Sequence, residues 1–333
     1  MLGFSQIALA VGRAGAGLVN KGLASLRLST LSSHLSYTAA ACSKMPYSTV
    51  ERGSPNTDNY RVFFKNESGA VVSPFHDIPL VVDREKGVFN MVVEIPRWSN
   101  AKMEICKEES LNPIKQDIKK GKLRYVKNIF PHKGYIWNYG ALPQTYEDPN
   151  HVTPDTGTNG DSDPIDVCEI GYKIHERGAV IQVKVVGIMC LIDEGETDWK
   201  VLAIDVTDPK ADSINDIDDV EKQFPGLLKA TYEWFKYYKV PDDKPENQFA
   251  FEGQAKDKEY TLKIIDETYG QWKDLVGKEG ESAINRKNVS VEDSPFRIDG
   301  AQAEKVVEES AAVGPAAAES QDINKWYYVI PQQ

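Results

Sequence analysis

Three carboxylates stand within six residues in the segment Asp161-Ser162-Asp163-Pro164-Ile165-Asp166. Pro164 lacks a backbone N–H and favours an extended conformation at the residue before it, so the segment is not helical. Side chains alternate along an extended chain, which predicts that Asp161 and Asp163 face the same way. Clustered anions repel one another unless protons or cations lie between them. Because oxygen ligands suit hard cations, the segment predicts a site for Mg²⁺, with Mn²⁺ as an alternative ion.

A second acidic stretch, Asp193–Lys200, follows a strongly apolar run and places Asp193, Asp198 and Lys200 around a strand-to-strand turn. Taken alone, either stretch could be a solvated acidic loop. An EF-hand is excluded for the first stretch, because Ile165 stands where an oxygen ligand is needed and Asp166 where glycine is needed. The sequence also contains no Walker A loop, no G-x-S-x-G motif and no H-E-x-x-H motif.

Basic and aromatic residues that could hold an anion lie in other segments. Lys102 and Glu104 alternate with apolar Met103, which predicts that the two charged side chains share one side of a strand. Tyr135 and Tyr139 are four residues apart in a predicted strand and face the same way. The remaining candidates are Glu94 at a strand end, Arg124, whose side chain is predicted to point to the opposite face of its strand from Leu123, and Tyr238-Lys239 at the end of an amphipathic helix.

The elements that must position these residues are mostly short strands, separated by Gly, Pro, Asn and Asp. Such a pattern favours a closed or partly closed antiparallel barrel. Predicted strands are 60–64, 79–82, 88–95, 101–106, 123–126, 135–139, 165–170, 180–192 and 199–206. Helices are predicted over 216–224, with Asp216 as N-cap, over 225–238, with Pro225 at the first helical position, and over 258–276.

Composition narrows the class of protein. The chain has 333 residues, with 41% hydrophobic and 27% charged residues, as is ordinary for a globular protein. Its net charge of −11 argues against direct nucleic-acid binding, which relies on basic surface. No apolar run is long enough to span a membrane. The four cysteines show neither C-x-x-C spacing nor His-rich neighbours, which argues against a structural zinc site or a disulfide framework.

Both ends of the chain differ in composition from its centre. Residues 1–45 contain four basic residues and no Asp or Glu, and they are rich in Ser, Ala, Gly and Leu. This composition predicts a transit peptide, for which mitochondria (the matrix) are the expected destination; the alternative is a disordered arm. Translation starting at Met45 would give a cytoplasmic form. Residues 299–333 are rich in Ala and Glu, which predicts a mobile C-terminal tail whose apolar end, Trp326–Ile330, docks back on the protein.

Several of these segments together resemble the eukaryotic branch of the family I soluble inorganic pyrophosphatases. The stretch Asp161–Val167 is similar to the signature of the family. Further similarity lies in Glu94–Arg97, Phe130–Tyr135, Asp193–Lys200 and Lys244–Phe251, and the resemblance extends from about Tyr60 to Gly277, with weaker likeness to about Phe296. It implies a catalytic domain over 46–298, with an OB-like five-stranded antiparallel barrel, additional strands and two or three amphipathic helices (α+β, mainly β).

The resemblance also implies an activity, the Mg²⁺-dependent hydrolysis of inorganic pyrophosphate with several ions in one site. It makes Asp163 the base that helps to deprotonate the attacking water, and it puts Tyr139 beside it in the catalytic group. The implied metal ligands, direct or through water, are Asp161, Asp166, Asp193, Asp198, Glu94 and Glu104. The implied substrate-binding residues are Lys102, Arg124, Tyr135, Lys200, Tyr238 and Lys239.

Physical chemistry agrees with these roles. Pyrophosphate is multiply charged and repels an anionic nucleophile, so cations held by carboxylates and a clamp of Lys and Arg are both needed.

The resemblance further implies a homodimer, with Arg97-Trp98, expected to be exposed at a strand end, as part of the contact. Two alternatives are a pyrophosphatase-fold subunit of a chromatin-associated assembly, and OB-type nucleic-acid binding. The second would require basic stripes with exposed aromatic residues, whereas the predicted cavity is acidic.

Overall fold

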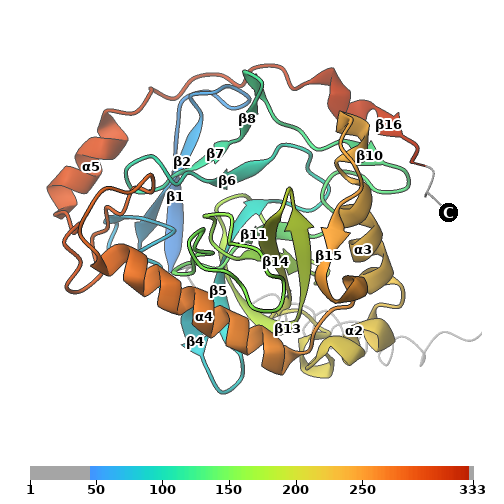
Figure 1. Cartoon of the computed structure of the whole chain (residues 1–333). Coiled ribbons are helices and arrows are strands. Elements are labelled where there is room, and N and C mark those ends of the chain that lie inside the picture. The colour runs from blue at the N-terminus through green and yellow to red at the C-terminus, as the bar shows by residue number, and fades with distance from the viewer. Residues whose placement is uncertain (1–45, 330–333) are drawn as a thin grey trace, which may run out of the picture. The chain divides into compact units, whose positions relative to one another are not determined.

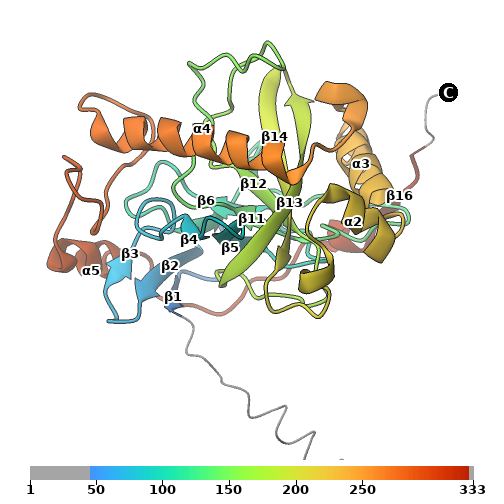
Figure 2. The same ribbon diagram turned by 90° about the horizontal axis from the view of Figure 1, so that it is seen from below.

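Five strands close into a ring at the centre of the described region, residues 46–329, of this computed structural model. The ring runs in the order β13, β14, β12, β11, β5 and back to β13. Figures 1 and 2 together label its strands. Closure depends on the length of β13, which pairs with β5 through Val180–Lys184 and with β14 through Val183–Asp193. The strands of the ring are β5 (Val88–Ile95), β11 (Asn138–Ala141), β12 (Asp166–Glu169), β13 (Val180–Asp193) and β14 (Glu196–Asp205).

The predicted OB-like five-stranded barrel is therefore confirmed, with one difference in strand direction. Four neighbouring pairs in the ring are antiparallel, but β12 and β14 run parallel. Between β11 and β5 the register shifts at Tyr139/Gly140. A Cβ atom on Gly140 would lie 1.9 Å from the carbonyl oxygen of Val92, so only glycine permits this close approach of the two strands.

Alternate residues of the barrel strands enter two separate apolar clusters, which explains why the strands read as nearly continuous hydrophobic runs. Trp199 and Val201 of β14 pack in the cluster that also contains Ile264, whereas Leu202 of the same strand packs in the cluster that contains Trp234. The two clusters thus bring α4 (Lys258–Gly277) and α3 (Leu227–Tyr237) against the barrel. Figures 1 and 2 show α4 running along the barrel beside β13.

The three predicted helices are present with small differences at their ends. Helix α2 (Ile217–Gln223) begins after Asp216, whose side chain accepts a hydrogen bond from the Ile217 N–H, as predicted. Helix α4 extends one residue beyond its predicted end. The prediction for the start of α3 was wrong: Gly226, at φ 85°, is the N-cap, and Pro225 lies before the helix. A left-handed residue at this position suits glycine and breaks the helix there.

A second sheet and several short pairs lie beside the barrel. The sheet contains β1 (Tyr47–Arg52), β2 (Arg61–Asn66), β3 (Val71–Val72), β6 (Met103–Ile105) and β7 (Ile114–Gln116). The edges of the barrel sheet are β4 (Val81–Asp83) and β15 (Gln248–Phe249). Separate two-stranded pairs are β8 (Ile118–Lys119) with β9 (Lys122–Leu123), and β10 (Asn128–Ile129) with β16 (Trp326–Tyr327).

The described part of the C-terminal segment contains α5 (Gly300–Glu308) and β16. Ala303 and Val307 of α5 pack in an apolar cluster with Phe63 and Leu111, and β16 pairs in parallel with β10. The predicted docking of the apolar end is therefore confirmed through Tyr327, while mobility of residues 299–333 stays a prediction. The expected transit peptide, residues 1–45, lies outside the described residues. Among residues 46–329, no helix is both long and apolar enough to cross a membrane.

Candidate active site

A cavity of about 250 Å³ opens beside the barrel and is walled by residues from several segments far apart in the sequence. Every predicted site residue lines it except Glu94 and Glu104. The predicted residues that line it are Lys102, Arg124, Tyr135, Tyr139, Asp161, Asp163, Asp166, Asp193, Asp198, Lys200, Tyr238 and Lys239. Sequence reasoning did not assign the other lining residues, Glu194, Glu196, Trp234 and Phe235.

The acidic segment reaches this cavity through a turn. Ser162 has a φ of 71°, and the Asp163 backbone N–H donates a 2.9 Å hydrogen bond to Asp161 Oδ1. The prediction of an extended conformation with alternating side chains was therefore wrong at Ser162, because the Asp161 side chain stabilises a local turn instead. Asp161 and Asp163 nevertheless both line the cavity, as predicted.

The parallel pairing of β12 with β14 sets Asp166 directly beside Lys200. The Lys200 ammonium lies 2.5 Å from Asp166 Oδ2, and it also contacts the carboxylate of Asp198. Burial raises the pKa of Asp198 to about 7; Lys200 opposes this change, and Asp166 adds to it. Burial lowers the pKa of Lys200, but Asp166 and Asp198 outweigh this effect and raise the pKa above its ordinary value. The site therefore holds a fixed cation among its acids.

Glu147, which the sequence analysis missed, completes an acidic cluster. Ligand atoms of Glu147, Asp161 and Asp198 all lie within 4.8 Å of one another. One Glu147 oxygen accepts the Trp199 N–H at 3.1 Å, whereas Oε2 is buried and has no hydrogen-bond partner among residues 46–329. Burial, together with Asp161 and Asp198, raises the pKa of Glu147. A buried carboxylate with a free oxygen beside two other carboxylates is the arrangement that a hard divalent cation would satisfy.

The backbone brings Glu147 to this position. Its N–H donates to the Asp163 carbonyl at 2.9 Å, and its own carbonyl accepts from Ser162 N–H at 2.9 Å. Gly160 makes the approach sterically feasible, since a Cβ atom there would lie 2.4 Å from the Glu147 carbonyl carbon. In the sequence, Glu147 stands in Gln144-Thr145-Tyr146-Glu147-Asp148, which has no feature of a metal site. No local spacing connects it with Asp161.

Three further basic residues, besides Lys200, line the same cavity. Lys102 contacts Glu104, which confirms that the two side chains share one side of the chain. Arg124 lies just after β9 and donates to Asp117 Oδ2 at 2.9 Å. Lys239, buried at the end of α3, contacts Asp193. Each cation is thus held by a carboxylate next to the cavity.

Tyrosine side chains connect the basic and acidic parts. Tyr139 belongs to β11, but Tyr135 precedes that strand, so the prediction that one strand carries both was wrong. Their ring centroids are still 5.0 Å apart, and both line the cavity. Burial raises the pKa of Tyr135 to about 12 and also raises the pKa values of Tyr139 and Tyr238. All three hydroxyls therefore stay protonated at neutral pH and can donate hydrogen bonds.

Glu94 and Glu104 lie behind the cavity wall. Glu94 is buried, and its Oε1 accepts the Ile105 N–H at 2.7 Å. Burial is the main cause of its raised pKa, and the neighbouring Asp166 adds to it. Glu104 reaches the site through its contact with Lys102. Their placement fits an indirect action, as the resemblance implied.

Lys107 is a second residue that the sequence analysis missed. Its Nζ lies 2.5 Å from Asp163 Oδ1. In the sequence it stands in Cys106-Lys107-Glu108-Glu109, which has the composition of an ordinary solvated charge run. Only the fold brings this run to the turn at Asp163.

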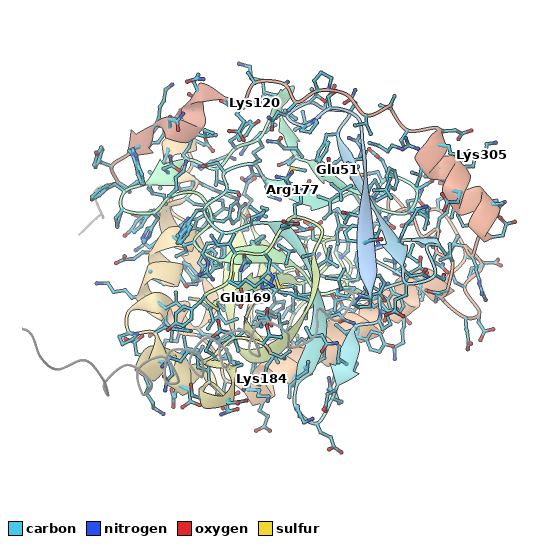
Figure 3. All side chains as sticks on the ribbon, turned by 180° about the vertical axis from the view of Figure 1, so that it is seen from behind. Glu51, Lys120, Glu169, Arg177, Lys184 and Lys305 are labelled. Carbon is cyan, nitrogen blue, oxygen red and sulfur yellow. The ribbon has the colours of Figure 1, made fainter. Side chains whose placement is uncertain are left out.

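Arg97 and Trp98 differ in exposure. Trp98 is 55% exposed, as predicted. The prediction of exposure was wrong for Arg97, whose side chain turns inward and donates to the Glu169 carbonyl oxygen at 3.2 Å. Glu169, the last residue of β12, is fully buried in the interior, whereas Lys305 lies on the peripheral helix α5 (Figure 3). The buried Glu169 carboxylate, 3.9 Å from the guanidinium, accounts for this inward orientation.

The fold and the site define a barrel protein whose cavity combines an oxygen-rich acidic cluster, suited to divalent cations, with a basic rim suited to an anion. The sequence model of the family described as inorganic pyrophosphatase matches residues 91–273. The chain is 58% identical over 293 residues to an inorganic pyrophosphatase of Candida glabrata, covering 86% of this chain and 99% of that one. It is 55% identical over 284 residues to an inorganic pyrophosphatase of Drosophila melanogaster, covering 85% and 84%.

A solved structure gives the same result. The inorganic pyrophosphatase of Schistosoma japonicum superposes with a TM-score of 0.80 at 52% identity, covering 85% of this chain and all of that one. The chain belongs to the inorganic pyrophosphatase family.

Proposed function

We propose that this chain hydrolyses inorganic pyrophosphate to two orthophosphates with Mg²⁺ as its cofactor. The single observation that carries the proposal is one cavity lined by both acids and bases, namely Asp161, Asp163, Asp166 and Asp198 together with Lys102, Arg124 and Lys239. Family membership at 55–58% identity to named inorganic pyrophosphatases supports the same substrate. The relatives are named as pyrophosphatases, so they give no support to the alternative of an assembly subunit.

Asp161, Asp166, Asp193, Asp198 and Glu147 are the residues that would hold Mg²⁺, because their carboxylates converge on the cavity or its acidic cluster. When bound, Mg²⁺ supplies positive charge that offsets the charge of the substrate and lowers the pKa of a water molecule. Glu94 and Glu104 support this set from behind the wall. The unpartnered oxygen of Glu147 is the observation that favours occupation by a cation.

The remaining residues bind the substrate and move a proton. Asp163 accepts the proton of the attacking water at its carboxylate, since it lies at the acidic side of the cavity with more exposure than its acidic neighbours. Lys102, Arg124, Lys200 and Lys239 neutralise charge on the phosphate oxygens. The hydroxyls of Tyr135, Tyr139 and Tyr238 stay protonated and donate hydrogen bonds to the same oxygens. The Lys200 ammonium lies 5.7 Å from the centroid of the Tyr139 ring, which places this tyrosine beside the acidic group.

Phosphate release from pyrophosphate, measured with and without Mg²⁺, tests this proposal on the chain starting near Met45. Asp163→Ala should slow release by about 10²- to 10⁴-fold, as removal of a general base does. Asp212→Ala, at an exposed position outside the cavity, is the matched control and should retain the wild-type rate. Absence of Mg²⁺-dependent release by the folded wild-type chain would disprove the proposed activity.

We further propose a homodimer whose contact includes Trp98, an exposed tryptophan. Sedimentation of Trp98→Ala tests the assignment, and an unchanged dimer would contradict it. Arg97→Ala should be studied separately, because its contact with Glu169 makes loss of folding stability the expected effect.

For residues 1–45, the acid-free basic composition supports import into the mitochondrial matrix. N-terminal sequencing of the organellar and cytosolic protein would test both this import and a start at Met45.

A further inference from the structure

We infer that Lys107 is a positioning residue that holds the Asp163 carboxylate in its reactive orientation. The inference rests on the proposed function, in which Asp163 accepts the proton of the attacking water. Its basis is the contact between Lys107 Nζ and Asp163 Oδ1, at 2.5 Å. A charge-assisted hydrogen bond of this length restrains one carboxylate oxygen, so the other oxygen has a defined direction.

The Lys107 ammonium contacts a residue of the cavity wall without being part of that wall. Asp163 lines the cavity, whereas Lys107 is not one of the residues that line it. The Lys107 side chain is largely buried, and it is less exposed than that of Asp163. A lysine in this position can act on the reaction through Asp163, while the four cavity-lining cations, Lys102, Arg124, Lys200 and Lys239, face the space that the substrate would fill.

The backbone of Lys107 is fixed independently of its side chain. Its carbonyl accepts the Asn285 N–H at 2.6 Å and lies 3.4 Å from Asn112 Nδ2. Asn112 is fully buried, and its Nδ2 also donates to the Asn285 carbonyl at 3.1 Å. The N–H of the preceding residue, Cys106, donates to the Pro113 carbonyl at 2.9 Å. The base of the side chain is therefore rigid, which is what a positioning role requires.

Asp163 itself is restrained on its other side by the turn. Its N–H donates to Asp161 Oδ1, and its carbonyl accepts the Glu147 N–H. These bonds fix the backbone and leave rotation of the carboxylate free. Lys107 is the neighbour, among the described residues, whose ion pair with Asp163 stops that rotation. Removing the ammonium should therefore reduce the turnover rate and leave substrate binding nearly unchanged.

A double-mutant cycle in the full chain tests the inference, with the magnesium complex of pyrophosphate (MgPPi) as substrate. Lys107→Met keeps the apolar part of the side chain and should lower kcat by about 10- to 100-fold, as loss of a supporting contact does. KM should stay near its wild-type value, and Lys107→Arg should restore part of kcat. In the Asp163→Ala background, Lys107→Met should cause no further loss, because it acts through the missing carboxylate.

Lys115→Met is the matched control, since Lys115 is similarly buried and pairs with Glu109, 3.5 Å away and outside the cavity. It should retain wild-type kinetics. Thermal melting reports folding, and Lys107→Gln replaces Lys107→Met in the cycle if the latter does not fold.

Two outcomes would overturn the inference: an unchanged kcat in Lys107→Met, or losses that multiply in the double variant. An unchanged kcat with a raised KM would make Lys107 a direct substrate ligand, and multiplying losses would show that it acts independently of Asp163. Failure of the proposed role of Asp163 would be recognised separately, because Asp163→Ala alone would then retain the wild-type rate.

Discussion

Lys200 Nζ lies 2.5 Å from Asp166 Oδ2. Lys200 belongs to β14, which runs parallel to β12, the strand that carries Asp166. The same ammonium contacts Asp198, so one buried cation serves two carboxylates. Replacing Lys200 by Met would leave those carboxylates without their partner in the metal-free protein. Loss of one member of a buried ion pair costs about 3–5 kcal/mol, although protonation of the acids would reduce this cost.

We therefore expect Lys200→Met to lower the melting temperature in EDTA much more than in Mg²⁺, because the bound ion would replace the lost charge. Thermal melting in both conditions measures the difference. Lys184→Met, which removes a lysine bonded to Asn215 outside the cavity, should lower both melting temperatures equally. An equal loss for Lys200→Met would show that the lysine contributes packing alone.

Glu147→Gln should weaken Mg²⁺ binding and stabilise the metal-free protein. The substitution keeps the shape of the side chain but removes one negative charge from a cluster within 4.8 Å of Asp161 and Asp198. Less repulsion raises the melting temperature in EDTA, while the loss of a ligand lowers Mg²⁺ affinity by about tenfold or more. Isothermal titration with Mg²⁺ and melting in EDTA measure these two effects. Glu267→Gln, at a carboxylate 2.7 Å from His151 Nε2, is the control, and a similar loss of affinity there would contradict a specific role for Glu147.

The raised pKa of Asp198 predicts opposite pH effects on stability and on metal binding. Its pKa is about 7 in the folded chain and 3.8 ordinarily, so between these values the folded state binds more protons than the unfolded state. The free energy of unfolding of the metal-free protein should therefore fall as pH rises from about 4 to 7. Mg²⁺ must displace the proton, so its apparent affinity should rise over the same window, by up to about tenfold per pH unit for one proton.

Denaturation in EDTA and Mg²⁺ titration at several pH values check these two trends. Asp198→Asn removes the titrating group and should flatten the stability profile between pH 4 and 7. A profile that keeps its slope in this variant would assign the effect to another carboxylate of the cluster.

The features that were predictable from the sequence depend on local spacing. The side-by-side placement of Lys102 and Glu104 follows from strand alternation, and the hairpin between Asp193 and Asp198 follows from the turn residues between two apolar runs. Glu147 and Lys107 were missed because their partners at 161–163 are brought to them by tertiary contacts that no local pattern encodes. The parallel pairing of β12 with β14 is likewise a property of the closed barrel. Residues 171–179 lead from β12 to β13, and the hairpin of β13 and β14 then brings β14 beside β12 in the same direction.

The C-terminal segment 320–329, which includes β16, should support the substrate side of the cavity. Asn128, which is buried, donates through Nδ2 to the carbonyls of Ile323 at 2.7 Å and Lys325 at 2.9 Å, and Lys133 Nζ donates to the Ile323 carbonyl at 2.7 Å. The segment anchored in this way lies between Arg124 and Tyr135, two residues of the cavity wall. Removing residues 320–333 would leave the Asn128 amide unsatisfied, at a cost of about 1–3 kcal/mol, and would loosen that wall.

We expect this truncation to lower the melting temperature and to raise KM for MgPPi more than it lowers kcat, because the basic rim binds substrate while the acids around Asp163 stay in place. Steady-state kinetics and thermal melting measure both effects. Removing only residues 330–333 is the control and should leave both values near wild type. Asn128→Ala in the full chain should reproduce part of the rise in KM. A truncated protein that melts earlier but keeps its KM would limit this C-terminal segment to a role in stability.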